Sequence, residues 1–494
     1  MPWRGAVGSR PGEAVRWAAT ALALAGLALA ALGSAGADAT TRGLRLGLAD
    51  ATFTNGDAAV REEWLGRARD AGADLVLLGV DWSAIAPRAP APGFDAADAA
   101  DPSYDWSALD AAVRSAVAQG LAPVLDVQVA PAWAEGPGRP SVEVAPPGTW
   151  KPSPAALGDF AAALATRYDG AFPDPTGSGG GPLPRVRWFQ VWAEQNLSLQ
   201  LNPIWDGKRL VSPDHYRRML NAAYAAIHAA SPGARVIVGG LAPYGDAVVG
   251  QGRVPPVWFW RALLCLRGPR LKPRRCPEPA RFDVAAHNPI SWKPWRNAFS
   301  PLDASMPDFG RLQRIVRRAV ATRRALPARP KPFWATEFWW DSSPPDPDGV
   351  PVGRQARFLG ESFYELWRQG VGAAIWWYLR DQAPGAAGFA ATQQSGLLYR
   401  DGVAKPAYRE FGFPFVARRE RGRVVLWGKA PAPGPVALER RRRRGWASLA
   451  RAVAGPNRVF VVRVAAAGAL RARARQGSEV SPIAGVAAGG GGPR

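Results

Sequence analysis

The stretch FQVWAEQNLSLQ, residues 189–200, begins as a buried strand and then breaks its own pattern. Residues 186–192, VRWFQVW, are rich in β-branched and aromatic side chains, as a strand in a packed sheet requires. Glu194 follows almost at once, with the amides Gln195 and Asn196 after it. The question is why an ionisable carboxylate stands where an apolar strand has just ended.

The chain on both sides makes this strand the fourth of eight. Strand-like segments alternate with segments of helical period, in which, for example, Leu109, Val113 and Ala116 share one face. Eight alternations predict a (β/α)8 barrel, and the span of about 370 residues requires loop insertions such as residues 137–152 and 173–184. The expected strands are 44–49, 75–80, 121–129, 186–192, 235–239, 282–286, 333–336 and 373–378. The expected helices are 58–71, 106–119, 154–168, 214–230, 257–266, 310–324 and 354–369, with mostly loop after the last strand.

A second carboxylate repeats the pattern of the first. In KPFWATEFWWDSS, residues 331–343, the seventh strand ends at Thr336 and Glu337, with Trp339 and Trp340 beside them. Active sites of this fold lie at the C-terminal ends of the strands, so Glu194 and Glu337 are expected to converge across the mouth. Two carboxylates in an aromatic cleft suit glycosidic bond hydrolysis, in which one protonates the leaving oxygen and the other attacks the anomeric carbon. The alternative is a pair of solvent-exposed rim glutamates.

Four motifs at strand ends resemble a known clan: WAEQN, FDVAAHNP, WATEFWW and AIWWY. They are similar to those of the retaining (β/α)8 glycoside hydrolases, of which the cellulase-like family five and the xylosidase-like family thirty-nine are nearest. The resemblance covers about residues 44–415. It implies that Glu194 is the general acid/base and Glu337 the nucleophile. It also implies that His287 contacts substrate or positions the nucleophile, and that Trp376 is the stacking floor. Further candidates for substrate binding are Asn288, Asn196, Trp82 and Trp339.

Two departures from the clan bear on activity. Members usually have Asn directly before the acid/base, where it bonds the sugar 2-hydroxyl, and this chain has Ala193. Many also carry an Arg on strand two, where this chain has Leu77. Bonds to the 2-hydroxyl are worth several kcal/mol in the transition state. Asn196 or Gln195 is a candidate substitute, and a barrel that binds glycan with weak or no cleavage is the alternative to an active enzyme.

The C-terminal part changes character. Residues 424–427, 436–439, 447–451, 459–464 and 469–474 are short strand-like runs broken by Gly, Pro and Asn, which predicts a small β-sandwich-like domain over 418–484. Two roles stay open for it: binding of glycan or cell wall, with Arg440–Arg444 on its surface, or a structural cap on the barrel. Residues 485–494 are expected to be a flexible Gly-rich tail.

The N-terminus and the cysteines indicate export. Arg4, Arg10 and Arg16 precede an apolar run over 17–32, and Ala35-Gly36-Ala37 follows, which is the layout of a secretory signal over 1–37. An uncleaved anchor is the alternative, and the barrel domain is expected to span 38–417. Cys265 and Cys276 close a basic loop, and a disulfide between them suits an oxidising compartment.

The net charge of +22 invites a nucleic-acid interpretation. The sequence contains no zinc-finger spacing, RNP-type signature or phosphate-cradling Gly-rich loop. Only 3 His occur, far apart, so we expect neither a metal site nor a cofactor. The expected partners are an oligo- or polysaccharide substrate and an anionic cell surface, without specific nucleic-acid binding, for a monomeric protein.

Overall fold

The computed structural model describes residues 43–177 and 180–488 of the 494-residue chain. The expected signal or anchor segment, residues 1–37, lies outside the described residues, as does the end of the expected tail from residue 489 onward. Within the described ranges, no helix has the length and apolar character needed to cross a membrane.

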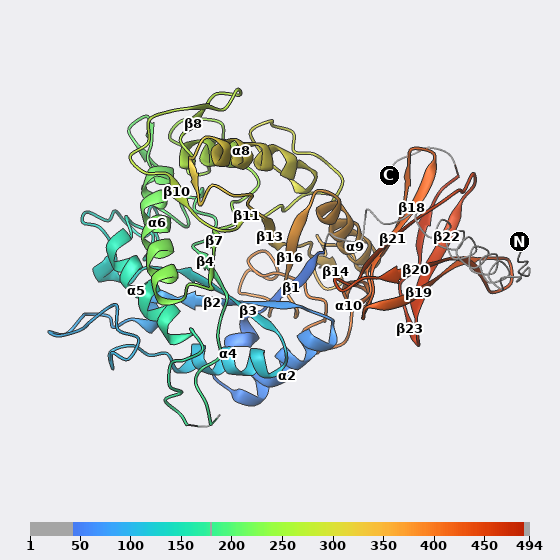
Figure 1. Cartoon of the computed structure of the whole chain (residues 1–494), viewed down its shortest axis with the longest axis horizontal. Coiled ribbons are helices and arrows are strands. Elements are labelled where there is room, and N and C mark those ends of the chain that lie inside the picture. The colour runs from blue at the N-terminus through green and yellow to red at the C-terminus, as the bar shows by residue number, and fades with distance from the viewer. Residues whose placement is uncertain (1–42, 178–179, 489–494) are drawn as a thin grey trace, which may run out of the picture.

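Eight parallel strands form a barrel in the larger part of the molecule (Figure 1). They are β1 (Arg45–Ala49), β2 (Leu75–Asp81), β3 (Ala122–Gln128), β4 (Trp188–Val191), β7 (Arg235–Val238), β11 (Ala285–His287), β13 (Phe333–Phe338) and β16 (Val371–Trp377). The strands pair in chain order from β1 to β7 and from β11 to β16, and β16 returns to β1. Parallel bridges from Ile237 to Val284 and from Leu241 to His287 join β7 to β11. The expected (β/α)8 barrel is therefore confirmed.

Helices surround the barrel, and several of them start where the sequence supplies a cap or a favourable first turn. Asp57 accepts hydrogen bonds from two backbone N–H groups at the start of α2, and Ser153 caps α5 ahead of a proline in the first turn. The segment expected to be mostly loop after the last strand contains the short helix α10. The helices are α2 (Ala58–Asp70), α4 (Ser107–Ala118), α5 (Pro154–Arg167), α6 (Ser212–Ala230), α7 (Pro256–Leu263), α8 (Phe309–Ala321), α9 (Val352–Arg368) and α10 (Pro406–Gly412).

Short elements occupy the loops. They are the helical turns η2 (Ala51–Thr54), α3 (Trp82–Ile85), η3 (Ala132–Ala134) and η4 (Met306–Asp308), with the strand pairs β5 (Trp205–Asp206) and β6 (Arg209–Leu210), β8 (Leu266–Arg267) and β9 (Lys272–Pro273), β10 (Ala280–Arg281) and β12 (Ala325–Leu326), and β14 (Ser342–Ser343) and β15 (Val350–Pro351). Cys265 and Cys276 form the expected disulfide across β8 and β9, with their Cα atoms 5.7 Å apart.

The interior of the barrel changes from apolar to polar along the strands. Near the N-terminal ends of the strands, Leu75, Val124 and Trp334 belong to one inward-facing apolar cluster. Nearer the C-terminal ends, Leu77 packs with Ile375 and other small or aromatic side chains in a second apolar cluster. Alternate residues of a strand face the same side, so the next inward positions toward the mouth can be read from the sequence. They are polar on neighbouring strands: Asp126 on β3 and Gln190 on β4.

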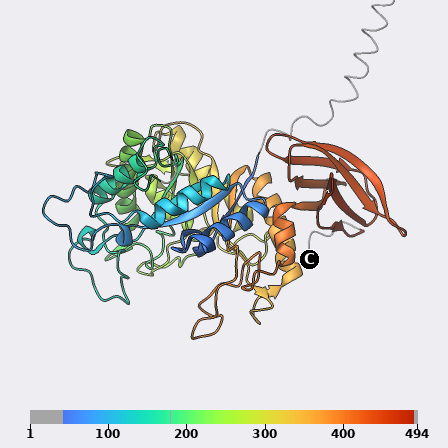
Figure 2. The ribbon, with the colours of Figure 1, turned by 90° about the horizontal axis from the view of Figure 1, so that it is seen from below.

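The C-terminal domain is a sandwich of two antiparallel sheets beside α9 and α10 (Figures 1 and 2). One sheet contains β17 (Phe415–Glu420), β18 (Arg423–Lys429) and β21 (Val459–Val464). The other contains β19 (Gly434–Arg441), β20 (Trp446–Ala454), β22 (Leu470–Gln476), β23 (Glu479–Val480) and β24 (Ala484–Val486). The five expected strand-like runs are all strands. β17 starts before the expected boundary after residue 417, and β24 extends into the start of the expected tail.

The first sheet of this domain is buried on both faces. On one face Val425 and Trp427 join the core of the barrel, where the Trp427 ring lies 5.8 Å from that of Tyr364 on α9. On the other face Val424 and Leu426 pack against the second sheet. The order of layers is therefore barrel helix, first sheet, second sheet, and the far face of the second sheet points away from the barrel.

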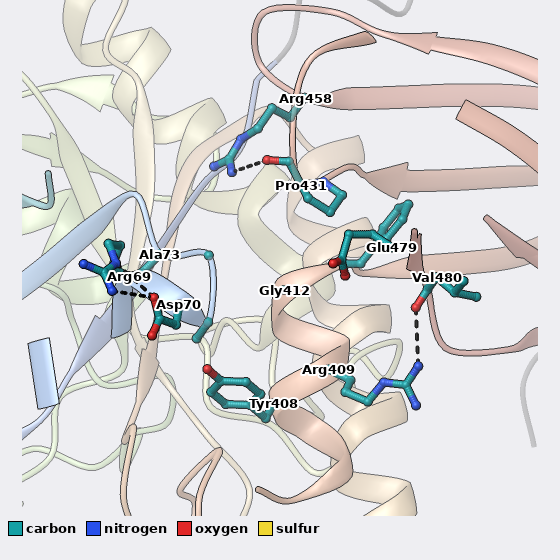
Figure 3. A pocket seen from close by; sticks show the side chains of 13 residues that line it. Arg69, Asp70, Ala73, Tyr408, Arg409, Gly412, Pro431, Arg458, Glu479 and Val480 are labelled. Carbon is teal, nitrogen blue, oxygen red and sulfur yellow. Dashed lines mark hydrogen bonds and ion pairs between the residues drawn. The ribbon is translucent and has the colours of Figure 1, made fainter. Parts of the chain in front are cut away.

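Polar contacts reinforce this junction at the N-terminal end of the barrel. Asp74, directly before β2, accepts hydrogen bonds from Lys429 Nζ (3.0 Å) and from the guanidinium of Arg458. A hollow of about 470 Å³ lies beside them, between α2, α10 and the C-terminal domain, with Tyr408 and Arg409 on one wall (Figure 3). It lies at the end of the barrel opposite to the C-terminal ends of the strands, and so it is not part of the barrel mouth.

Candidate active site

The turn after β4 holds Glu194 in an unusual backbone conformation. Trp192 has φ 69° and Glu194 has φ 46°, both in the left-handed region that non-glycine residues rarely adopt. The Glu194 N–H donates to the Gly240 carbonyl at 2.8 Å, which ties the turn to the end of β7. Such conformations persist only where the surroundings enforce them, and they concentrate at functional sites.

Glu337 occupies an irregular part of β13. The pairing of β13 with β16 shifts register between Ala335 and Phe338, so that Thr336 and Glu337 fall in a bulge. A bulge at a barrel rim turns the local side chains in a new direction. Glu337 is half-buried, whereas its neighbours Thr336 and Phe338 are fully buried.

Asn288 joins the two carboxylates. Asn288 lies directly after β11. Its side-chain nitrogen donates to Glu194 Oε1 at 3.1 Å and to Glu337 Oε2 at 3.0 Å. Thr336 Oγ1 donates to the Asn288 carbonyl oxygen at 3.0 Å and holds the amide in this orientation. Because both oxygens bond to the same nitrogen at 3.1 and 3.0 Å, the two carboxylate oxygens lie no more than about 6 Å apart. The expected convergence of Glu194 and Glu337 is present.

Two glycines after β7 permit this close approach. A Cβ on Gly240 would overlap the side chains of Asn288 and Thr336, and a Cβ on Gly239 would overlap the Trp192 carbonyl. Any side chain at these positions would push the strand-four turn or the bridging amide away. The Gly239-Gly240 pair is therefore part of what positions the carboxylates, although neither glycine faces the reaction.

The electrostatics of the pair favour one shared proton. Burial raises the pKa of Glu194, and the hydrogen bond from Asn288 opposes this effect. Burial also raises the pKa of Glu337 well above its usual value, and the negative charges of Glu194 and Asp126 raise it further. Since two interacting carboxyls lose their protons in separate steps, one intermediate state holds one proton and one charge. Among the described residues, no Lys or Arg hydrogen-bonds to either carboxylate.

Asp126 is a third carboxylate that the sequence analysis missed. It lies on β3 and accepts hydrogen bonds from Gln190 Nε2 at 2.9 Å and Gln128 Nε2 at 2.6 Å. Burial raises the pKa of Asp126 to about 7. The signal was present in the strand APVLDVQ, residues 122–128, where an acid stands among apolar residues at the same parity as the inward-facing Val124.

The prediction that the Trp376 ring stacks under the sugar is wrong by one residue. Trp376 is fully buried, donates from Nε1 to the Ser395 carbonyl at 2.9 Å and packs its ring against Phe338 and Trp340 outside the barrel. Ala373 and Ile375 face inward on β16, so alternation puts Trp377 on the inner side. Trp377 is half-buried, and the peptide bond from it to Tyr378 is cis. Trp377 is the better candidate for the stacking surface.

Three further expected substrate contacts are buried in the fold. His287 is fully buried, its Nε2 lies 2.7 Å from the Ala304 carbonyl, and burial lowers its pKa to about 4. Asn196 is fully buried and bonds the backbone of Ala242 and Val254. Trp82 is fully buried and stacks on Phe160. These residues support the mouth from behind instead of lining it.

The two departures from the clan remain uncompensated. Gln195 is fully buried and donates to the Gly239 carbonyl at 3.0 Å, so neither it nor Asn196 replaces an Asn at position 193. Leu77 packs inside the barrel with Ala49 and Ile375. Gly79, the next residue of β2 at the same parity, has open space where a side chain would begin. No cation on β2 therefore reaches the carboxylates.

The rim offers aromatic surfaces for a longer ligand. Trp339 is half-buried two residues after Glu337, and Trp292, in the loop that follows Asn288, is 75 % exposed. A hollow of about 860 Å³ lies on the loops after β3 and β4 and on α6, with Trp150 and Trp205 in its wall. Lys151 lies over the Trp150 ring at 4.8 Å. The side chains of Trp292, Trp150 and Trp205 were not among the sequence candidates.

The fold and the strand-end residues define the class of protein: a (β/α)8 barrel with two glutamates held together at its mouth. No protein-family model and no curated protein matches the chain. A family 39 glycoside hydrolase from Bacteroides cellulosilyticus WH2 is similar in structure, with a TM-score of 0.51, 15 % identity, and coverage of 86 % of this chain and 79 % of that one. The GH39 enzyme of Xanthomonas axonopodis pv. citri has a TM-score of 0.47 at 14 % identity, covering 87 % and 92 %. GH5_18 of Streptomyces cattleya has a TM-score of 0.44 at 19 % identity, covering 75 % and 79 %. At these identities the likeness describes the fold.

Proposed function

We propose that this protein is a secreted glycoside hydrolase that cleaves O-glycosidic bonds of an oligo- or polysaccharide with retention of configuration. The observation that carries the proposal is the amide of Asn288, which donates to Glu194 and Glu337 together. A separation of at most about 6 Å between these oxygens supports the about 5–5.5 Å spacing of retaining enzymes over the about 6.5–9.5 Å of inverting ones.

The two glutamates divide the reaction. Glu337 attacks the anomeric carbon while the bond to the leaving sugar breaks, and the leaving oxygen takes the proton of Glu194. Glu194 then accepts a proton from water, whose oxygen attacks the anomeric carbon and releases Glu337. Asn288 stays bonded to the carboxylates and keeps their separation constant. Trp377 supplies an aromatic face for the sugar beside the reacting bond.

Export and substrate size follow from other parts of the chain. The basic, apolar and small-residue layout of residues 1–37 supports secretion, with an anchored form as the alternative. The disulfide between Cys265 and Cys276 is compatible with an oxidising compartment. Trp292, which is exposed in the loop after Asn288, supports a substrate longer than one sugar unit. We expect a monomer that needs no cofactor.

A second candidate is a barrel that binds glycan without cleaving it. Ala193 removes the bond to the sugar 2-hydroxyl, and no described cation lies against Glu337 to favour its ionised form. Both features weaken catalysis without harming the aromatic surfaces. This candidate leaves the strained turn at Glu194 and the shared amide without a purpose.

A panel of aryl glycosides and polysaccharides separates the two candidates. Wild type, Glu194→Gln and Glu337→Gln are assayed in parallel, with Glu143→Gln in an exposed loop as the matched control. Turnover by wild type and by Glu143→Gln that is lost in both other variants supports the enzyme. An inactive wild type that still binds sugars would support the second candidate, and Ala193→Asn is then the first reversion to test.

A further inference from the structure

The positive charge of the chain is concentrated in the C-terminal domain. Residues 43–414 contain 41 Lys or Arg against 35 Asp or Glu, whereas residues 415–488 contain 16 against 3. A general arginine bias would affect both parts in proportion to their lengths. The excess in the smaller domain therefore needs a local explanation.

Much of this charge lies on one face of the second sheet. Val436 and Leu438 of β19 and Ala472 and Ala474 of β22 point into the sandwich, so the residues between them point outward. The outward positions of β22 are Arg471, Arg473 and Arg475, which follow one another at intervals of roughly 7 Å along the strand. Register with β19 places Arg441 and Arg451 on the same face.

The edge of the sheet extends this face. The turn between β19 and β20 carries Arg442, Arg443 and Arg444, all exposed. On the outward positions of the described strands β19, β20 and β22, the one acidic residue is Glu439, which pairs with Arg473 at 2.7 Å and with Arg475 at 3.6 Å. We call the set Arg441–Arg444, Arg451, Arg471, Arg473 and Arg475 the arginine face. It lies on the face of the second sheet opposite to the one packed against the first sheet, and all of its residues except Arg473 are exposed.

We propose that the arginine face binds an anionic polysaccharide, one that bears carboxylate or sulfate groups, and thereby holds the barrel near its substrate. Arginine presents a planar fork of donors that matches carboxylate and sulfate oxygens in pairs. A row of guanidiniums along one strand suits the regularly spaced charges of a linear polymer. Binding through a rigidly attached domain raises the effective concentration of the barrel at the polymer.

The chemistry of the face favours a polysaccharide over the two other common polyanionic partners. Single-stranded nucleic acid is held by stacking on free aromatic rings. The face has one ring, Trp446, and the guanidiniums of Arg441 and Arg473 already lie over it at 5.5 and 4.1 Å. A membrane surface would require apolar side chains to insert. Apart from Trp446, Val453, 68 % exposed, is the one large apolar side chain on the outward positions of these described strands.

The test measures binding of the full mature chain to immobilised polygalacturonate, heparin, single-stranded DNA and vesicles of anionic phospholipid at low salt. The variant combines Arg451→Gln, Arg471→Gln and Arg475→Gln, which leaves the pair of Arg473 with Glu439 intact. Arg314→Gln, Arg317→Gln and Arg354→Gln, all exposed on α8 and α9, form the matched control with the same loss of charge. We expect wild type and control to bind at least one of the two polysaccharides, and the variant to bind it about ten- to hundredfold more weakly.

Four results would overturn the proposal. They are absence of binding to both polysaccharides, equal binding by the variant and wild type, equal weakening in the control, and tighter binding to DNA or vesicles than to either polysaccharide. Thermal unfolding of the variant at the wild-type temperature shows that its fold is intact. If the variant unfolds at a lower temperature, it is replaced by the double variant Arg471→Lys with Arg475→Lys. This double variant keeps the positive charge and tests only the paired N–H donors of the guanidinium groups. The readout is binding, so it is independent of whether the barrel proves to be a hydrolase.

Discussion

The mouth of the barrel and the arginine face are both clusters of like charge, and they differ in how much water each charge keeps. At the mouth, Asp126 is fully buried, Glu194 and Glu337 are half-buried, and burial raises all three pKa values. On the arginine face, most of the guanidiniums point into solvent. A buried cluster is costly unless its protonation changes, which makes it suited to proton transfer. An exposed cluster keeps its charge and is suited to attracting a partner from a distance.

The largest expected effect is at Glu337. Replacing it with Gly removes the group that forms the covalent intermediate and leaves a space beside the anomeric carbon. We expect activity on an activated aryl glycoside to fall by about 10⁴-fold or more. Added azide or formate should restore part of it, and the product should be the glycosyl azide or formate of inverted configuration.

The control for this prediction is Glu194→Gly, which opens a similar space on the other carboxylate. Rescue of that variant with inversion, and not of Glu337→Gly, would exchange the two roles. Polyanion binding should be the same in both variants and in wild type, because the arginine face is on the other domain.

A smaller effect, dependent on the leaving group, is expected at Glu194. Glu194→Ala removes the proton donor, so substrates with poor leaving groups should lose about 10²–10⁴-fold in kcat/KM. A good leaving group departs without a proton and should lose much less in the first step. A plot of log kcat/KM against the pKa of the leaving group should therefore be steeper than in wild type. Equal losses across the series would contradict the acid role.

The sequence predicts the barrel and the convergence of Glu194 and Glu337 because both depend on long-range pattern. Eight apolar segments with a helix between them leave few alternatives, and the ends of strands four and seven must lie at the mouth. What the sequence analysis missed depends on the direction of single side chains. Trp376 and Trp377 are chemically identical, and only the parity of Ala373 and Ile375 separates the outer ring from the inner one.

Local backbone geometry accounts for the other errors. Asn196 follows Glu194 by two residues, but the left-handed turn directs its amide into the fold, where it bonds Ala242 and Val254. His287 is the last residue of β11, and its neighbour Asn288, one step further, reaches the mouth. Asp126 was available from parity alone, because an acid in the middle of an apolar strand has to face a polar interior.

A moderate effect on pH dependence is expected at Asp126. Above its own pKa of about 7, Asp126 carries a negative charge that raises the pKa of Glu337, so Asp126→Asn should lower that pKa. The acid limb of kcat/KM, which reports ionisation of the nucleophile in the free enzyme, should move to lower pH by about one unit or less. The exposed Asp98→Asn should leave the limb unchanged. A shift to higher pH would mean that Asp126 does not act through its charge.

The same substitution has a consequence for stability. The folded pKa of Asp126, about 7, is above the unfolded value, so the folded state holds the extra proton between about pH 4 and 7. Unfolding free energy therefore falls as pH rises through this range, and the Asn variant should lack this part of the slope. Denaturant unfolding of both proteins at pH 5 and pH 7.5 measures the difference.

The smallest expected effect is that of salt on catalysis, and it tests the comparison itself. Between 0.1 and 1 M NaCl the screening length falls from about 10 to about 3 Å, which weakens exposed charges far more than buried ones. Binding of the arginine face to polygalacturonate or heparin should be lost, while kcat/KM on a neutral aryl glycoside should change by less than about twofold. On an anionic polysaccharide, activity should fall with salt in wild type and already be low in the variant with Arg451, Arg471 and Arg475 replaced by Gln. Activity on the neutral glycoside could instead fall in parallel with polyanion binding. Salt ions would then screen the carboxylates at the mouth as well, and the contrast between buried charges at the mouth and exposed charges on the arginine face would be wrong.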